Sequence, residues 1–168
     1  MATNLQFIKS ASGSGVSSLS VTDCFNANYD VYQVLVTTLQ TSTSANIDVR
    51  FINASGVVTG ATYNEAIQVL ISNSSYSAIT GEGVTSIGGI SFGNGAVTGA
   101  SINMTVYNPH NSSSFTFLTD SSNAWTGALQ GYQGIGVEKT AQTITGINFF
   151  PSTGTLTEMK ISVYGIKG

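Results

Sequence analysis

The sequence contains very little charge of either sign. Charged residues make up 8% of the chain, whereas typical soluble domains carry about 25%. The five basic residues are scattered along the sequence. Because nucleic-acid binding needs clustered Lys and Arg to neutralise phosphates, we expect no nucleic-acid partner. The sequence has neither a basic amphipathic pattern nor an apolar run of about 20 residues, so we also expect no membrane partner.

The scarcity of cysteine and histidine excludes several kinds of site. Cys24 is the single cysteine, so it cannot form an intramolecular disulfide, and we interpret it as a small buried hydrophobic residue. His110 lies in the segment NPHN and is interpreted as a solvated turn residue. The sequence therefore predicts no metal site and no cofactor. The N-terminus lacks the charged and apolar regions of a signal peptide, which indicates a soluble protein made in a cytoplasm.

The sequence also lacks a recognisable catalytic motif. No G-x-S-x-G segment supports a Ser-His-Asp triad. The strings GNG (93–95) and GIG (134–136) lack the context of a phosphate-binding loop and are interpreted as turns or bulges. We expect the eight acidic residues near turns or on outward strand positions, where they aid solubility. A glycosidase needs two carboxylates that flank a cleft. We expect no such pair, and the chain is predicted not to be an enzyme.

Ser, Thr, Asn and Gly, in contrast, make up close to half of the chain. With 8 Phe, 7 Tyr and 41% hydrophobic residues, the chain should nevertheless fold. Only two prolines interrupt a pattern that is dominated by period-2 alternation. Strand signals recur between turn signals, which predicts an all-β fold. We expect an antiparallel, jelly-roll-like β-sandwich of roughly eight to ten strands in a single domain over residues 1–168.

Five segments carry more specific predictions. YDVYQVLVTTL (29–39) has apolar residues at both sets of alternating positions, which predicts a central strand buried on both faces. YNEAIQVLI (63–71) is expected to be a strand rather than a short helix, and ISNSSYSAITGEG (71–83) a long polar loop or edge region. MKISVYG (159–165) is expected to pair with FIKS (7–10), which would bring the two termini close together.

The glycine-rich segment 121–136 carries the single tryptophan and is the best candidate for a contact site. An exposed Trp125, together with Tyr132, could stack on a sugar or anchor a protein interface. The alternative, which we favour from the sequence, is that Trp125 packs in the core beneath a loop.

Three stretches resemble small structural proteins of tailed bacteriophages: CFNANYDVYQVLVTTLQ (24–40), INASGVVTGATYNEA (52–66) and GINFFPSTGTLTEMKISVYGIKG (146–168). The last contains a final strand of the pattern I-x-x-Y-G. The resemblance covers about half of the chain and rests on structural motifs, so it transfers no functional residue. It implies a β-sandwich protein of the virion, either a head decoration (cement) protein or a tail-fibre or appendage domain.

Three functional hypotheses follow. The leading one is a non-enzymatic decoration protein that forms a homo-oligomer, with a trimer favoured, and binds the major capsid protein or another virion protein. Its neutral polar surface would suit a wet interface, and an early strand such as NLQFIK (4–9) could pair with a neighbour by strand addition. The second is a receptor-binding tail-fibre domain that recognises host surface glycans through Trp125 and Tyr132. The third is a glycan-processing enzyme, which would require a carboxylate pair.

Overall fold

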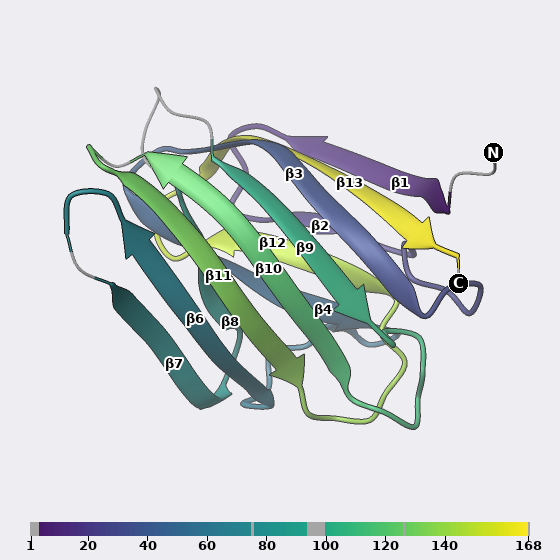
Figure 1. The fold of residues 1–168 in the computed structure, drawn as a ribbon. Coiled ribbons are helices and arrows are strands. Elements are labelled where there is room, and N and C mark those ends of the chain that lie inside the picture. Colours follow the sequence, from purple (N-terminus) through teal and green to yellow (C-terminus); the bar gives the residue numbers. More distant parts are fainter. Residues whose placement is uncertain (1–3, 75, 94–99, 126, 168) are drawn as a thin grey trace.

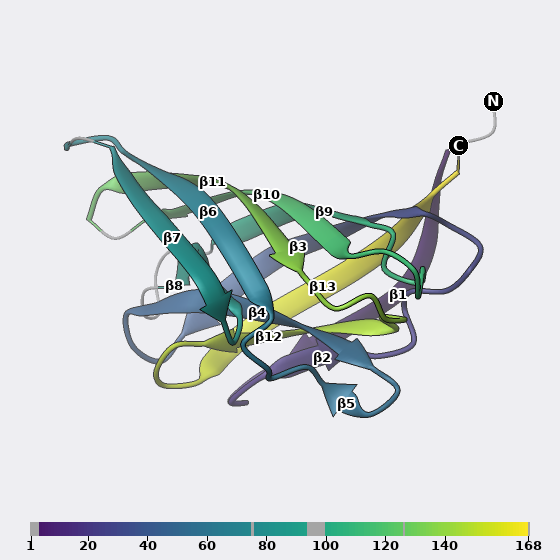
Figure 2. The same cartoon turned by 90° about the horizontal axis from the view of Figure 1, so that it is seen from below.

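The computed structural model describes residues 4–74, 76–93, 100–125 and 127–167, with the backbone alone at residues 92 and 93. These residues form thirteen strands in two antiparallel sheets, which pack face to face (Figures 1 and 2). The predicted antiparallel β-sandwich is confirmed. None of the described residues forms a helix that is long and apolar enough to cross a membrane.

The larger sheet has eight strands in the order β1-β13-β3-β9-β10-β11-β6-β7. Their bounds, in that order, are Leu5–Gly13, Leu156–Ile166, Val31–Thr41, Ser101–Tyr107, Thr116–Trp125, Leu129–Glu138, Tyr63–Ile71 and Ser77–Val84. Strand β1 forms one edge of this sheet, beside the last described residues of the chain, and β7 forms the opposite edge (Figure 1).

The smaller sheet has five strands in the order β2-β12-β4-β5, with β8 also paired to β4. Their bounds are Leu19–Val21, Gly146–Pro151, Ala45–Asn53, Gly56–Val57 and Ile87–Gly93 for β2, β12, β4, β5 and β8. Seen from below, this sheet forms a second layer beneath the larger one (Figure 2).

The strands outnumber the roughly eight to ten expected because short and polar segments also pair. Strand β5 has only two residues. Strand β7 lies in the segment predicted as a polar loop or edge region, and it forms the edge of the larger sheet by pairing with β6. Residues 63–71 form β6, as predicted.

Strand β3 is central, as expected, but it is not buried on both faces. It lies between β13 and β9. Tyr32, Val34 and Val36 are buried against the smaller sheet, whereas Gln33 is half-buried and Thr37 is exposed on the other side. The prediction of burial on both faces is wrong because only one face of the larger sheet is covered by a second sheet.

The first and last strands pair with each other, as predicted. In β1 and β13, Phe7 lies opposite Tyr164 and Ser10 lies opposite Ser162. The ladder continues beyond the strands, where the Lys167 amide donates to the carbonyl oxygen of Asn4 at 2.9 Å. This pairing satisfies the backbone groups of both terminal strands and holds the two ends of the described chain together.

Strand β8 contains a glycine bulge. Ser91 pairs with Ile47 and Ile87 pairs with Val49, so three residues of β8 lie opposite a single residue of β4. Gly89 adopts a φ of 65°, a left-handed conformation that favours glycine.

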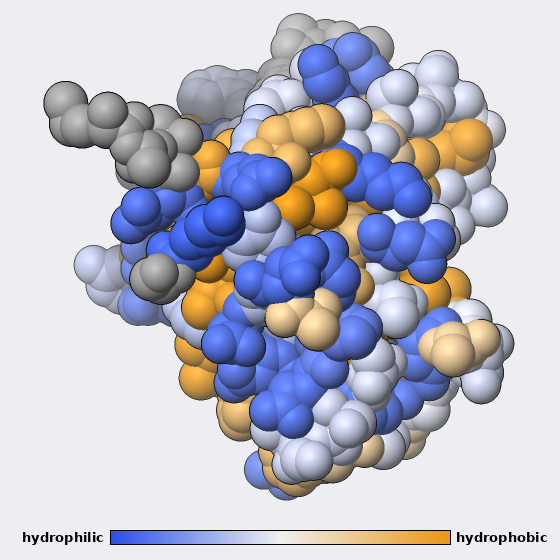
Figure 3. All heavy atoms as spheres, turned by 90° about the vertical axis from the view of Figure 1, so that its right-hand side faces the viewer, coloured by the Kyte–Doolittle hydropathy of each residue, from blue (hydrophilic) through white to orange (hydrophobic). Residues whose placement is uncertain are grey.

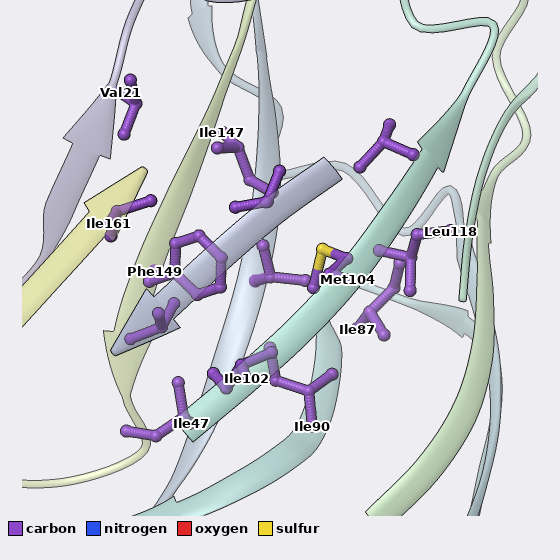
Figure 4. Packing of buried hydrophobic residues seen from close by; sticks show 14 of the residues in the cluster. Val21, Ile47, Ile87, Ile90, Ile102, Met104, Leu118, Ile147, Phe149 and Ile161 are labelled. Atoms are coloured by element: carbon purple, nitrogen blue, oxygen red, sulfur yellow. The ribbon is translucent and has the colours of Figure 1, made fainter. Parts of the chain in front are cut away.

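The core lies between the two sheets and draws on both. Figure 4 shows Ile102 and Met104 of β9 in the same cluster as Ile147 and Phe149 of β12, together with residues of β4 and β8. All four of these side chains are at most 2% exposed. The alternating apolar residues of β13, which include Ile161, also point into this core.

Candidate binding surface

The β10–β11 hairpin exposes several large apolar side chains on its outer face and buries several polar ones on its inner face. On β10, Phe117 and Trp125 are 48% and 50% exposed, whereas Asp120 and Ser122 are buried. On β11, Leu129 and Ile135 are 55% and 60% exposed, whereas the inward positions hold Tyr132, Gly134, Gly136 and Glu138. A sheet face that is covered only by water usually carries the polar residues, so this arrangement marks the outer face of the hairpin as a contact surface.

The exposed apolar residues of the molecule concentrate on the larger sheet. Ten large hydrophobic side chains are exposed among the described residues, and nine of them lie on or directly beside strands of this sheet; the tenth, Val57, lies on β5. Isolated exposed hydrophobic residues are normal, but their concentration on one sheet indicates a site of interaction.

A groove lies on the outer face between β10 and β7. It has a volume of about 330 Å³ and is lined by Phe117, Ile135 and Val137, with Ala66 on its floor and Glu82 beside it. We call it the Phe117–Ile135 groove. In the register of the sheet, Phe117 lies opposite Val137, and Thr119 lies opposite Ile135. The apolar lining could accept an aliphatic or aromatic side chain of a partner.

A second hollow of about 470 Å³ lies at the other end of the hairpin. It is lined by Leu70, Tyr76 and Leu129, together with the polar residues Asn123 and Gln130. Trp125 lies opposite Leu129 across the hairpin, and Tyr76 is 75% exposed. Aromatic rings beside amide side chains form a surface that could stack on a sugar ring and hydrogen-bond to its hydroxyl groups.

The structure separates the two residues that the sequence singled out for contact. Trp125 lies on the outer face and is half-exposed, so the favoured interpretation that it packs in the core is wrong. Tyr132 faces the interior at 4% exposure, and its hydroxyl donates to the side-chain oxygen of Gln130. Burial raises the pKa of Tyr132 to about 12. The two aromatic rings therefore cannot act together on one ligand, because they lie on opposite faces of the sheet.

Two acidic side chains are buried, contrary to the prediction that the acidic residues lie near turns or on outward positions. Asp120 is 6% exposed, and neither carboxylate oxygen has a hydrogen-bond partner in the described part of the chain. Burial raises the pKa of Asp120 to about 7. Glu138 is fully buried, but it accepts hydrogen bonds from the Thr140 amide and the side chain of Gln142.

Asp48 and Glu65 converge on the bulge of β8. Asp48 of β4 accepts a hydrogen bond from the Gly89 amide at 3.0 Å, and Glu65 of β6 accepts one from the Gly88 amide. Burial raises the pKa of both carboxyl groups, and Asp48 raises that of Glu65 further. The pair thus links the two sheets through consecutive amides. The absence of a converging carboxylate pair, predicted from the sequence, is therefore wrong, although the backbone holds each of these two carboxylates.

The glycines of the GIG string lie inside β11 rather than in a turn or bulge, so the prediction is wrong for this string. Residues 94 and 95 of the GNG string lie outside the described residues. A Cβ at Gly134 would lie 2.5 Å from an oxygen of Asp120, and one at Gly136 would lie 2.5 Å from the Ile87 side chain. Both glycines pair regularly with β10. They are required because β8 and the side chain of Asp120 approach the inner face of β11 closely.

Charge is distributed unevenly along the larger sheet. Strands β10, β11, β6 and β7 form one half, which contains four acidic residues and, along the described length of these strands, no Lys or Arg. The strands of the other half contain Lys9, Glu158 and Lys160. Charged residues also stand directly beside strands of both halves: the exposed Lys139 follows β11, Asp30 precedes β3, and Lys167 follows β13. Within its strands, the half that carries the Phe117–Ile135 groove is therefore acidic, whereas the other half carries charges of both signs.

The described residues contain neither a cluster that could bind a metal ion nor a reactive thiol. No group of three or more His, Cys, Asp or Glu side chains there could hold a metal ion. Cys24 is fully buried, as the sequence predicted, and its thiol donates to the Val21 carbonyl oxygen at 3.2 Å. Burial raises the pKa of Cys24 to about 12, which keeps the thiol protonated and unreactive at neutral pH.

No protein-family model matches the chain, and no curated protein matches it in sequence. Among solved structures, a fructofuranosidase from Schwanniomyces occidentalis complexed with fructosylnystose aligns with 98% of this chain at 10% identity and a TM-score of 0.22. The chain spans 35% of the length of that enzyme. A similarity this low carries no argument about fold or function.

Proposed function

We propose that this chain is a non-enzymatic structural protein of a bacteriophage particle, an oligomeric decoration (cement) protein that binds the major capsid protein on the head. The observation that carries the proposal is the outward-facing set of apolar side chains on the β10–β11 hairpin, which includes Phe117 and Ile135. A protein that works by assembly needs such a surface, because docked apolar groups supply most of the binding energy at an interface.

Three further features support an assembly role. The surface carries few charges, so salt has little to screen when the protein binds. The terminal strands are paired to each other, which suits a component that must remain folded on an exposed lattice. The resemblance of residues 24–40, 52–66 and 146–168 to phage structural proteins points in the same direction. A trimer and a position in the virion belong to this proposal.

The decisive experiment is the copy number of the protein in purified phage particles, measured by quantitative mass spectrometry against the major capsid protein. Hundreds of copies per particle are expected for a protein on the head lattice. A few dozen copies or fewer would favour a position on the tail or at a vertex. Absence from the particle would overturn the proposal and return attention to the enzyme hypothesis, in which Asp48 and Glu65 would be the first residues to test.

The exposure of Trp125 favours a second candidate, a tail-fibre domain that recognises host glycans. Its ring is half-exposed beside Leu129, next to a hollow that also contains Tyr76 and Asn123. For this function, Trp125→Ala should abolish adsorption to host cells while it changes the free energy of unfolding by less than about 1 kcal/mol, as expected for a surface position. A decoration protein with the same substitution should leave adsorption unchanged.

A further inference from the structure

Two groups of exposed apolar residues lie at opposite ends of the larger sheet but at the same level along its strands. Leu5 and Phe7 of β1 are 40% and 55% exposed at the edge that carries the termini. Cross-strand pairing leads from Phe7 through Tyr164, Gln33, Thr105 and Thr119 to Ile135. A second row of cross-strand pairs leads from Leu5 through Ile166, Val31 and Tyr107 to Phe117. The apolar edge and the Phe117–Ile135 groove therefore occupy the same two rows of the sheet.

The charges around these two groups are complementary. Glu65 and Glu82 line the groove, and the exposed Lys139 lies just beyond the end of β11. Lys167 is exposed, and its backbone bonds to Asn4 directly beside the start of β1. Figure 3 shows the side of the molecule that lies at the right of Figure 1, where β1 is found; hydrophilic side chains there surround separate hydrophobic patches. An apolar edge flanked by a lysine matches an apolar groove flanked by a glutamate.

Both edges of the larger sheet are protected against direct strand pairing. In β1 the register shifts between Phe7 and Lys9, and the exposed Lys9 donates from its ammonium group to the Thr22 carbonyl oxygen at 2.7 Å. In β7, Gly83 adopts a φ of 62° at a second register shift. Bulges and lysines on edge strands are devices that prevent strand addition. A contact at these edges would therefore use side chains rather than a shared backbone ladder, contrary to the strand addition expected for residues 4–9.

We propose that the Phe117–Ile135 groove binds the Leu5–Phe7 edge of a second copy of this chain, with Lys167 of one subunit close to Glu82 of the next. The contact is head-to-tail, so every subunit offers both an edge and a groove. Such contacts close into a ring when the rotation between subunits permits it, and a ring of three agrees with the proposed trimer. This inference rests on the proposed assembly function and names the surfaces through which copies join.

The first test uses one substitution on each surface and sedimentation velocity as the measurement. The wild type should sediment as a closed oligomer, whereas Phe7→Ser and Ile135→Ser should each sediment as a monomer. A mixture of the two variants retains one intact edge and one intact groove, so it should form a dimer with a single junction. The matched control is Val57→Ser, which alters an exposed apolar residue on the smaller sheet and should leave the oligomer unchanged. Circular dichroism confirms that each variant is folded.

A second test exchanges the charges. Glu82→Lys and Lys167→Glu should each weaken the oligomer, and the chain with both substitutions should recover it. A monomeric wild type, an unchanged oligomer in Phe7→Ser, or a mixture that remains monomeric would overturn the inference. The result is separable from the proposed function: a monomer found in hundreds of copies per particle would overturn the head-to-tail contact and still support decoration of the head.

Discussion

On the outer face of the smaller sheet, polar and aromatic side chains bind one another. The amide of Asn148 donates to the Ser20 hydroxyl at 2.9 Å, and the guanidinium of Arg50 lies 4.4 Å from the ring centre of Phe150. The outer face of the larger sheet instead leaves Phe117 and Ile135 largely open to water. The side chains on the outer face of the smaller sheet therefore find partners within the monomer, whereas the outer face of the larger sheet leaves its apolar side chains without such contacts.

The same contrast runs through the β10–β11 hairpin itself. Its inner face holds the carboxyl group of Asp120 without a hydrogen-bond partner in the described residues, and its outer face exposes Phe117, Trp125, Leu129 and Ile135. Both features lower the stability of the monomer. Positions that are not optimised for stability are the pattern expected at functional sites.

The largest expected effect is the difference in unfolding free energy between removing a ring from inside the sandwich and removing one from its outer face. Phe149→Ala should lower the free energy of unfolding by about 3–5 kcal/mol, because the buried ring leaves a cavity between the sheets. Phe117→Ala, which removes a ring of the same size from the outer face, should lower it by less than about 1 kcal/mol in the monomer. Urea denaturation of both variants measures the difference. Equal losses would contradict the assignment of Phe117 to an open surface.

The next effect concerns the pH dependence of stability. The pKa of Asp120 is raised from 3.8 to about 7 by burial, so the folded protein binds this proton more tightly than the unfolded chain. The associated stability is complete below about pH 4 and is lost as the pH rises through about 7. The raised pKa values of Asp48 and Glu65 act in the same direction. Denaturation at a series of pH values should show a decline of about 4 kcal/mol from Asp120 alone.

Asp120→Asn tests the origin of that decline. The amide cannot ionise, so the variant should be less sensitive to pH and should exceed the wild type in stability above pH 7. At pH 4 the two proteins should differ by about 1 kcal/mol or less. A variant that declines with pH as steeply as the wild type would show that other groups carry the effect.

A smaller effect is expected where β8 approaches the inner face of β11. Gly136→Ala should destabilise the fold by about 1–3 kcal/mol, because the new Cβ would lie 2.5 Å from the Ile87 side chain. Gly131→Ala in the same strand is the matched control, since its nearest neighbour would be at 3.7 Å. The control should change stability by less than about 0.5 kcal/mol. Thermal unfolding of both variants provides the comparison, and equal losses would contradict a close approach at Gly136.

The sequence predicted best what depends on local alternation. Period-2 patterns located the strands, and the apolar positions Met159, Ile161 and Val163 are buried as expected. The pairing of β1 with β13 was also predicted, because both segments alternate and lie at opposite ends of the chain. The number of strands was underestimated, since short segments such as Gly56–Val57 pair only because a neighbour lies beside them.

The candidate surface was harder to predict because it depends on which face of a strand turns inward. In residues 114–119, SFTFLT, one set of alternating positions holds Phe115 and Phe117 and the other holds Leu118, so alternation alone does not choose a face. The partial burial of Asp48 and Glu65 depends on contacts between β8 and the distant segments β4 and β6. The exposure of Trp125 follows from the register of the hairpin, which no local pattern specifies.

The smallest expected effect compares polar side chains on the two outer faces. Asn148 is buried at 5% exposure and bonds to Ser20, so Asn148→Ala should cost about 1 kcal/mol, the value of a hydrogen bond whose partner is left behind. Gln133 lies exposed on the outer face of β11, and Gln133→Ala should change the stability of the monomer by less than about 0.5 kcal/mol. If the larger sheet is an assembly surface, Gln133→Ala should instead alter the oligomer. Chemical denaturation should therefore show the larger effect in Asn148→Ala, and sedimentation should show the larger effect in Gln133→Ala. If Gln133→Ala lowered the stability of the monomer as much as Asn148→Ala does, the distinction between the two faces would be lost.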